Sequence, residues 1–269
     1  MLVRALSGVV FVCVVIGAIF WGGPSYVFLL AIVSGIALHE YMSNVQKTGK
    51  ADFHGLQKVL PLVAGFSVLL YGNALFYAPN KSVLLVIPLM LMLAFARLVF
   101  TKMVNGINTI AYTFMGLGWV TFNFILLIYW AYIYGEYSYT YLIGGIIFIW
   151  VNDSFAYLTG RFIGKRKLYE RVSPNKTWEG TIGGLLFAVL AGFLFAYFGE
   201  FDSLVWMGFG LICGLCATVG DLFESVIKRS LGVKDMGKIM PGHGGMLDRF
   251  DALIFAAPFG AAYIHLVMI

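Results

Sequence analysis

Charged residues are scarce in this sequence. Asp, Glu, Lys and Arg make up 12% of the 269 residues, whereas hydrophobic residues make up 61%; an average soluble domain has about 25% charged residues. Cysteine is equally rare, with three residues, and Cys213 and Cys216 lie in an apolar run without a neighbouring histidine, which is typical of helix packing. The composition excludes a disordered chain and a secreted disulfide scaffold. The apolar runs are continuous and do not alternate, which argues against a membrane β-barrel.

Apolar segments long enough to cross a bilayer as helices recur along the chain. They cover residues 5–22, 24–42, 59–78, 82–100, 108–134, 141–160, 180–198, 203–228 and 249–268. The fifth segment leaves two alternatives open, one long tilted helix or two short helices broken near Gly116 and Gly118. No small-residue cleavage site follows the first segment, so we expect it to remain as a helix. The sequence predicts an all-α integral membrane protein with about nine transmembrane helices.

The distribution of basic residues predicts the orientation. With a cytoplasmic N-terminus, the cytoplasmic side would hold 17 of the 18 Lys and Arg residues, and the opposite side only Lys81 together with Glu136, Glu200 and Asp202. This asymmetry matches the positive-inside rule. We therefore expect the N-terminus in the cytoplasm and the C-terminus on the opposite side. No separate soluble domain is expected, only N-terminal spans in residues 1–140 and a C-terminal region in residues 141–269.

Ionisable residues interrupt the last spans, where each costs about 2.5 to 3.5 kcal/mol on insertion scales. At 100° per residue, Asp221, Glu224, Ser225 and Lys228 share one face of the eighth span. All lie in the expected cytoplasmic half of the membrane, so they can surround one cavity open to that side.

Further carboxylates belong to the same half of the membrane. Asp248 and Asp251 share a face at the start of the ninth span, and Asn152 and Asp153 lie in the sixth. One interpretation is a set of intramembrane salt bridges with Lys228, Arg229 or Arg249. The other is a Mg²⁺ site, because carboxylates together with phosphate oxygens are the usual ligands of this ion.

Two basic loops flank these carboxylates. Between spans eight and nine, Pro241-Gly242 and Gly244-Gly245 surround His243 among several cations, and such glycine-rich turns can bring backbone N–H groups to a polyphosphate. In the other loop, residues 165–171 are typical of contacts with anionic lipid. The turn-rich residues 173–179 are consistent with a substrate-ordering loop in which Lys176 contacts phosphate.

Read as one string, Ser225-x-x-Lys-Arg-x(4)-Lys-Asp-x-Gly-x(3)-Pro-Gly-His-Gly-Gly-x-x-Asp-Arg-x-Asp251 resembles the signature of the phosphatidate cytidylyltransferases, also called CDP-diacylglycerol synthases. We see no departure from that signature in residues 225–251. Ser173-Pro-Asn-Lys-Thr-Trp-Glu-Gly180, Gly220-Asp221 and Asn152-Asp153 also look like family features. The resemblance covers residues 150–251, and no functional residue is carried over to the first five spans.

The resemblance implies an enzyme of phospholipid biosynthesis that converts CTP and phosphatidic acid to CDP-diacylglycerol and pyrophosphate. It implies one or two Mg²⁺ ions and leaves a monovalent cation and a homodimer open. The partners are then the two substrates and the lipid bilayer, with no nucleic acid. The short loops suit a bacterial inner membrane, with the active site facing the cytoplasm.

The resemblance and the spacing of polar residues together assign roles to particular positions. The expected metal ligands are Asp221 and Asp248, with Asp251 and Glu224 as further ligands or acceptors behind them. The expected catalytic residues are Asp221, Asp248, Lys228 and Arg249. The expected substrate-binding residues are Ser173, Asn175, Lys176, Ser225, Arg229, Lys234, His243, Asn152 and Asp153.

Alternative functions make different demands on the sequence. A CDP-alcohol phosphotransferase would need a D-x-x-D-G-x-x-A-R-type cluster, which is absent from the sequence. A cation-coupled transporter would place polar residues across the full membrane depth, but here they cluster on one side of the last four spans. A related CTP-using lipid enzyme, such as a polyprenol kinase or a CDP-archaeol synthase, stays open because it needs similar phosphate and metal groups.

Overall fold

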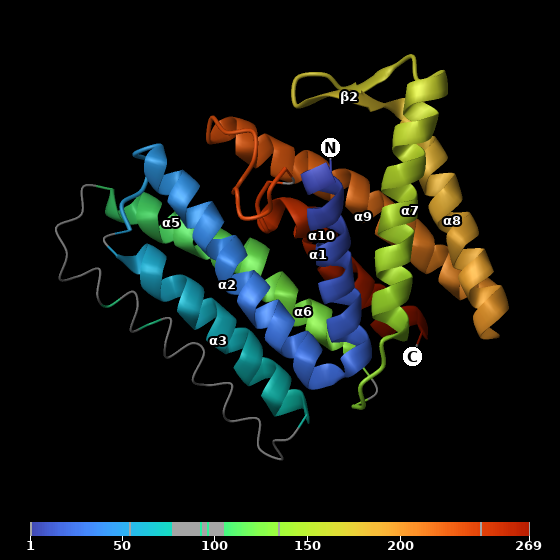
Figure 1. The fold of residues 1–269 in the computed structure, drawn as a ribbon, viewed down its shortest axis with the longest axis horizontal. Coiled ribbons are helices and arrows are strands. Elements are labelled where there is room, and N and C mark those ends of the chain that lie inside the picture. Colours follow the sequence, from blue (N-terminus) through green and yellow to red (C-terminus); the bar gives the residue numbers. More distant parts are fainter. Residues whose placement is uncertain are drawn as a thin grey trace. The chain divides into compact units, whose positions relative to one another are not determined.

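The computed structural model describes residues 2–53, 55–76, 92, 96, 105–133, 135–242 and 244–268. Almost all of the secondary structure in these residues is helical, and one short hairpin interrupts it (Figure 1). The elements are α1 (Leu2–Trp21), α2 (Gly23–Lys47), α3 (Leu56–Phe76), α5 (Gly106–Gly116), the π-helical η2 (Leu117–Thr121), α6 (Phe122–Ala131), α7 (Thr140–Ile163), β1 (Lys167–Tyr169), β2 (Ser173–Thr177), α8 (Trp178–Gly199), α9 (Ser203–Ser230), α10 (Leu247–Tyr263) and the π-helical η3 (Ile264–Met268).

Six helices of the described residues are long and apolar enough to cross a membrane. They are Gly23–Lys47, Gly106–Ala131, Thr140–Ile163, Trp178–Gly199, Ser203–Ser230 and Leu247–Met268. Two further apolar helices, Leu6–Trp21 and Lys58–Ala74, are shorter. The chain is therefore an integral membrane protein. The predicted span at 82–100 falls almost entirely outside the described residues, so the count of nine and the orientation stay predictions.

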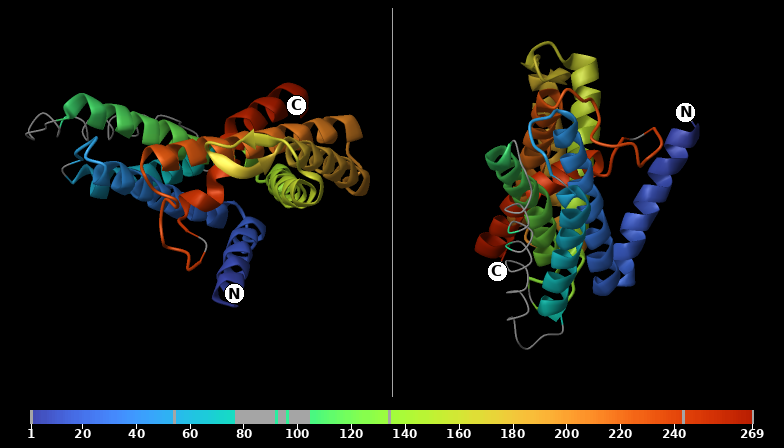
Figure 2. Two further views of the ribbon diagram at one scale, coloured as in Figure 1. Left: turned by 90° about the horizontal axis from the view of Figure 1, so that it is seen from above. Right: turned by 90° about the vertical axis from the view of Figure 1, so that its left-hand side faces the viewer.

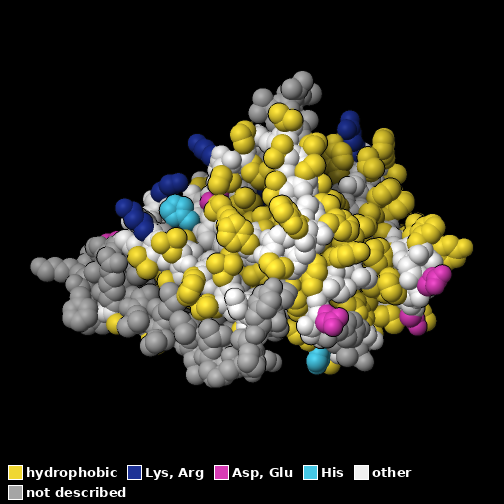
Figure 3. Space-filling model, turned by 60° about the horizontal axis from the view of Figure 1, so that its bottom comes forward, with side chains coloured by type: hydrophobic (Ala, Val, Ile, Leu, Met, Phe, Trp, Pro, Cys, Tyr) yellow, Lys and Arg dark blue, Asp and Glu magenta, His cyan; other side chains and the backbone are white. Residues whose placement is uncertain are grey.

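Hydrophobic side chains cover much of the described surface visible in Figure 3. On α8, the large apolar side chains of Ile182, Leu186 and Leu190 are all exposed, and their spacing places them on one face of the helix. In a soluble protein such a face would be unfavourable, whereas in a membrane it contacts lipid tails.

The fifth predicted span is one continuous helix. Residues Gly106–Ala131 run through α5, η2 and α6 without a break. The π-helical turn Leu117–Thr121 lies at Gly116 and Gly118, near which the sequence left open a break between two short helices. A single π-turn inserts one residue into a helix without ending it, which is why the long-helix alternative is correct.

The chain divides into two compact units. The first contains Met1–Ile128, Tyr134–Tyr137 and Leu231–Arg249. In this unit α2 packs against α1, α3 and α5, and its side chains Leu38, Tyr41 and Met42 are almost completely buried. The loop that follows α9 in the sequence therefore belongs to the same unit as the N-terminal helices.

The second unit contains Tyr129–Ile133, Ser138–Ser230 and Phe250–Ile269. Here α8 packs against both α7 and α9 (Figures 1 and 2). Buried aromatic rings pack inside the unit. The Trp206 and Phe209 rings, for example, meet edge to face with their centroids 5.8 Å apart. The Trp130 indole donates a hydrogen bond of 2.9 Å to the carbonyl of Ala257, which satisfies its buried N–H group.

The two strands form an antiparallel hairpin between α7 and α8 (Figure 1). Lys167 pairs with Thr177 and Tyr169 with Ser173. The sequence predicted only a turn-rich loop here. The hairpin was not anticipated because three- and five-residue strands are too short to show a clear period of two.

Gly220 allows α9 and α10 to approach closely. A Cβ atom at this position would lie 2.7 Å from the Cβ of Phe255 and 3.2 Å from the carbonyl oxygen of Asp251. Both distances are shorter than ordinary van der Waals contact. The missing side chain therefore lets the helix that carries Asp221 lie directly against the helix that carries Asp251.

We expect Gly220→Ala to lower the midpoint of thermal unfolding in detergent, because overpacking a close helix contact costs about 1 to 3 kcal/mol. Gly17→Ala on α1 is the matched control, since nothing lies within 4 Å of a Cβ there. Equal midpoints for the two variants would contradict the close packing of α9 on α10.

Candidate active site

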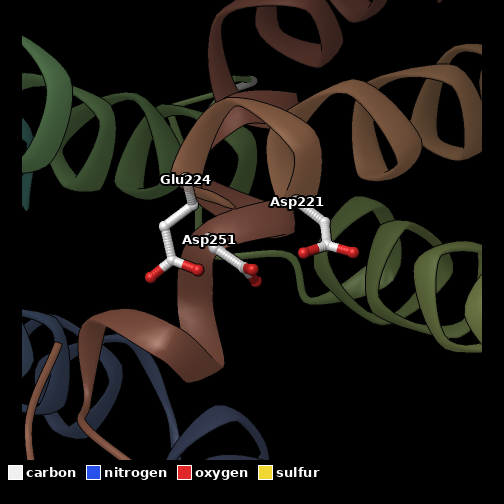
Figure 4. A group of neighbouring side chains, drawn as sticks. All are labelled: Asp221, Glu224 and Asp251. Carbon is white, nitrogen blue, oxygen red and sulfur yellow. The ribbon is translucent and has the colours of Figure 1, made fainter. Parts of the chain in front are cut away.

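Three carboxylates converge from two helices. Asp221 and Glu224 extend from α9 and Asp251 from α10 toward the same point (Figure 4). One oxygen atom of each carboxylate lies within 4.8 Å of the others. Glu224 is completely buried, while Asp221 and Asp251 are partly exposed. We call these three residues the acidic cluster; among the described residues, they are the one group found that could hold a metal ion.

Two lysines neutralise part of the acidic cluster. The ammonium group of Lys176 lies 2.5 Å from Oδ2 of Asp221, and that of Lys228 lies 2.5 Å from Oε2 of Glu224. Lys228 follows Glu224 by one helical turn, which is a favourable spacing for an ion pair. The hydroxyl of Ser225 donates to Oδ1 of Asp221 at 3.4 Å. The structure thus brings together the four polar residues that the sequence placed on one face of the eighth span.

The β1–β2 hairpin brings Lys176 to the cluster. Thr177 caps α8 by accepting the N–H of Gly180 at 3.1 Å. The Glu179 carboxylate accepts the N–H groups of Lys165 and Arg166 at 3.0 and 3.2 Å. Because both interactions tie the base of the hairpin to the start of α8, they fix the strand on which Lys176 lies.

Asn152 and Asp153 lie beside the cluster in different ways. Asn152 is buried in α7, and its amide donates to the Thr218 hydroxyl at 3.4 Å and to Asp153 at 3.3 Å. Asp153 interacts electrostatically with Asp251, Asp221 and Lys176. Asp153 therefore adds a fourth carboxylate to the field of the cluster, whereas the contacts of Asn152 are those of a residue packed between helices.

Asp248 is placed differently from the cluster. It is buried, and its Oδ2 atom accepts the N–H groups of Met236 at 2.9 Å and Gly245 at 2.8 Å. These contacts close the loop between α9 and α10 on itself. Asp248 is not a member of the metal-competent group, and its predicted role as a metal ligand stays a prediction.

The other predicted site residues lie on loops and helix ends. Ser173 and Asn175 belong to β2, Arg229 to the last turn of α9, Lys234 to the loop and Arg249 to the first turn of α10. All but Ser173 have exposed side chains. His243 lies outside the described residues.

The sequence interpretation missed Glu40. This residue of α2 is 8% exposed, and its carboxylate accepts the N–H groups of Met246 and Leu247 at 3.0 Å each. A signal was present, because Glu40 is an ionisable residue within the predicted span 24–42. The cost of placing an ionisable residue in a membrane span, which singled out the carboxylates of the last spans, applies equally to Glu40.

The model of the cytidylyltransferase family matches residues 2–267. Relatives named phosphatidate cytidylyltransferase match this chain, among them the following three. The relative from Bacillus subtilis (strain 168) is 31% identical over 264 residues, 95% of this chain and 94% of its own length. That from Staphylococcus haemolyticus (strain JCSC1435) is 30% identical over 262 residues, 96% of each chain. That from Staphylococcus aureus (strain COL) is 47% identical over 120 residues, 44% of this chain and 46% of its own length.

This chain therefore belongs to the cytidylyltransferase family, a family of nucleotidyltransferases. The resemblance noted from residues 150–251 is confirmed, and it extends to the N-terminal helices as well.

The buried Glu224–Lys228 pair gives a testable prediction. We expect Lys228→Met to reduce stability by about 3 kcal/mol, because it leaves the negative charge of Glu224 buried without this cation. The double variant Glu224→Gln/Lys228→Met removes both charges and should unfold in detergent at a higher temperature than the single variant. A double variant that unfolds at a lower temperature would refute the coupling between the two charges.

Proposed function

We propose that this protein transfers the cytidylyl group of CTP to phosphatidic acid, forming CDP-diacylglycerol and pyrophosphate. The convergence of Asp221, Glu224 and Asp251 beside Lys176 and Lys228 carries the proposal, because this arrangement can hold a cation and phosphate groups together. The names of relatives aligned over nearly the whole chain support the choice of substrates.

The acidic cluster fits a divalent cation. Its ligands are carboxylate oxygens, which Mg²⁺ prefers. When ionised, the three cluster carboxylates and Asp153 leave two negative charges uncompensated by Lys176 and Lys228. One Mg²⁺ ion would balance them. Bound there, Mg²⁺ would neutralise charge on the phosphates of CTP and on the departing pyrophosphate.

The lipid substrate needs no general base from the protein. A phosphate monoester has a second pKa of about 6, so it is mostly a dianion at neutral pH. One of its oxygens forms a bond to the α-phosphorus of CTP, and the bond from that phosphorus to the bridging oxygen breaks to release pyrophosphate. The protein's contribution is positioning and charge neutralisation. Lys176 is the cation best placed for this, since it pairs with Asp221 and both side chains are partly exposed.

The remaining assignments follow from the family signature. We propose that the exposed cations Arg229, Lys234 and Arg249 bind phosphate oxygens, together with His243. Ser173, Asn175 and Ser225 would contribute hydrogen bonds, and Asp248 remains a proposed ligand for a second ion. The catalytic region would be residues 141–269, in a bacterial inner membrane with the site facing the cytoplasm.

We expect Asp221→Asn and Asp251→Asn to reduce turnover by about 10²-fold or more. The assay measures pyrophosphate and labelled liponucleotide formed from CTP by the purified protein, with and without phosphatidic acid and Mg²⁺. Glu136→Gln is the matched control, because this exposed carboxylate lies outside the cluster. Full activity of both aspartate variants would refute the cluster as the site; phosphatidate-independent turnover would refute the substrate.

The orientation is tested by cysteine labelling. In a variant with its native cysteines replaced, we expect Glu136→Cys to react with an impermeant maleimide added to intact cells. Glu170→Cys, in the turn of the hairpin, should react only after the membrane is opened. The reverse pattern would place the site on the outer side.

A further inference from the structure

Two buried polar side chains lie one turn apart on α2. Glu40 is 8% exposed and Asn44 is 4% exposed. A charged residue within a membrane span costs about 2.5 to 3.5 kcal/mol on insertion scales unless partners compensate for it. Both residues find these partners in the backbone of the signature loop, which we define as residues 236–248.

Each side chain binds a different part of the signature loop. The Glu40 carboxylate accepts the N–H of Met246 with Oε1 and that of Leu247 with Oε2, at 3.0 Å each. The Asn44 amide donates to the carbonyl oxygen of Met236 at 2.5 Å. Because the N–H groups at a helix start lack intrahelical partners, Glu40 satisfies donors at the very start of α10.

The signature loop is shaped to receive the Glu40 carboxylate. A Cβ atom at Gly237 or at Gly245 would collide with one or the other oxygen of Glu40. The Oδ2 atom of Asp248 accepts the N–H of Gly245 at 2.8 Å, next to the residues that Glu40 binds. Two carboxylates thus hold adjacent N–H groups of one short segment.

We propose that Glu40 is a positioning residue for the catalytic region, acting through the signature loop and α10, with Asn44 as its second anchor. This inference rests on the proposed function. α10 is a continuous helix that begins at Leu247, and Asp251 follows one turn later. Fixing the first N–H groups of this helix fixes its start and its rotation, and so the direction in which Asp251 points.

Glu40→Gln is the most informative substitution. Glutamine has nearly the shape of glutamate, but its amide offers one acceptor oxygen and one NH₂ donor. One of the two N–H groups of the loop would then face a donor. Glu40→Asp keeps both acceptors on a shorter side chain and should retain part of the effect. Ser34→Ala is the control: Ser34 is a buried polar residue on the same helix, and its hydroxyl has no hydrogen-bond partner among the described residues.

Two measurements on the purified full-length protein test the proposal. Hydrogen exchange should become faster in residues 244–248 of Glu40→Gln, because one of the two N–H groups that Glu40 binds loses its acceptor. Calorimetric titration of Glu40→Gln with Mg²⁺ should show an affinity reduced by about 10–100-fold, as is typical when a residue that orients a metal ligand is replaced. In both the exchange rate and the Mg²⁺ affinity, Glu40→Asp should lie between Glu40→Gln and the unaltered protein. Ser34→Ala should match the unaltered protein in both.

The outcomes separate the two proposals. Faster exchange with unchanged Mg²⁺ affinity would overturn the positioning role and leave Glu40 as a loop anchor only. Unchanged exchange would overturn the contact itself. If the unaltered protein neither binds Mg²⁺ nor turns over CTP, the proposed function fails, and the positioning role that rests on it fails with it.

Discussion

The structure depends on holding three carboxylates close together in a chain that is otherwise apolar. Like charges at this distance repel strongly where the dielectric is low, so Asp221, Glu224 and Asp251 require compensation. Lys176 and Lys228 supply part of it at 2.5 Å. Gly220 lets α9 and α10 lie close together, and the hairpin carries Lys176 to Asp221, so both contribute to this arrangement.

The acidic residues described above fall into two kinds. Asp248, Glu40 and Glu179 accept backbone N–H groups and thereby shape the signature loop and the hairpin. In the acidic cluster, Asp221 and Glu224 face lysine side chains, and Asp251 accepts the N–H of its own neighbour Ala252 at 2.7 Å. The first kind builds the local structure, and the second is left with the charge that a cation would balance.

Much of this could be predicted from the sequence. Continuous apolar runs located every described helix to within a few residues, and helical periodicity placed Asp221, Glu224 and Lys228 on one face. The contact of Asp251 with this face was harder, because it depends on helix packing that periodicity does not determine. The β1–β2 hairpin and the contacts of Glu40 were missed, since the strands are short and the loop bonds connect residues more than 200 positions apart.

The most direct test of the central claim is to locate a bound divalent ion. Anomalous diffraction from crystals grown with Mn²⁺, a substitute for Mg²⁺ that prefers similar ligands, should show a peak coordinated by Asp221, Glu224 and Asp251. A well-ordered structure in saturating Mn²⁺ with no peak at these three side chains, or with Mn²⁺ bound at other residues alone, would contradict the account.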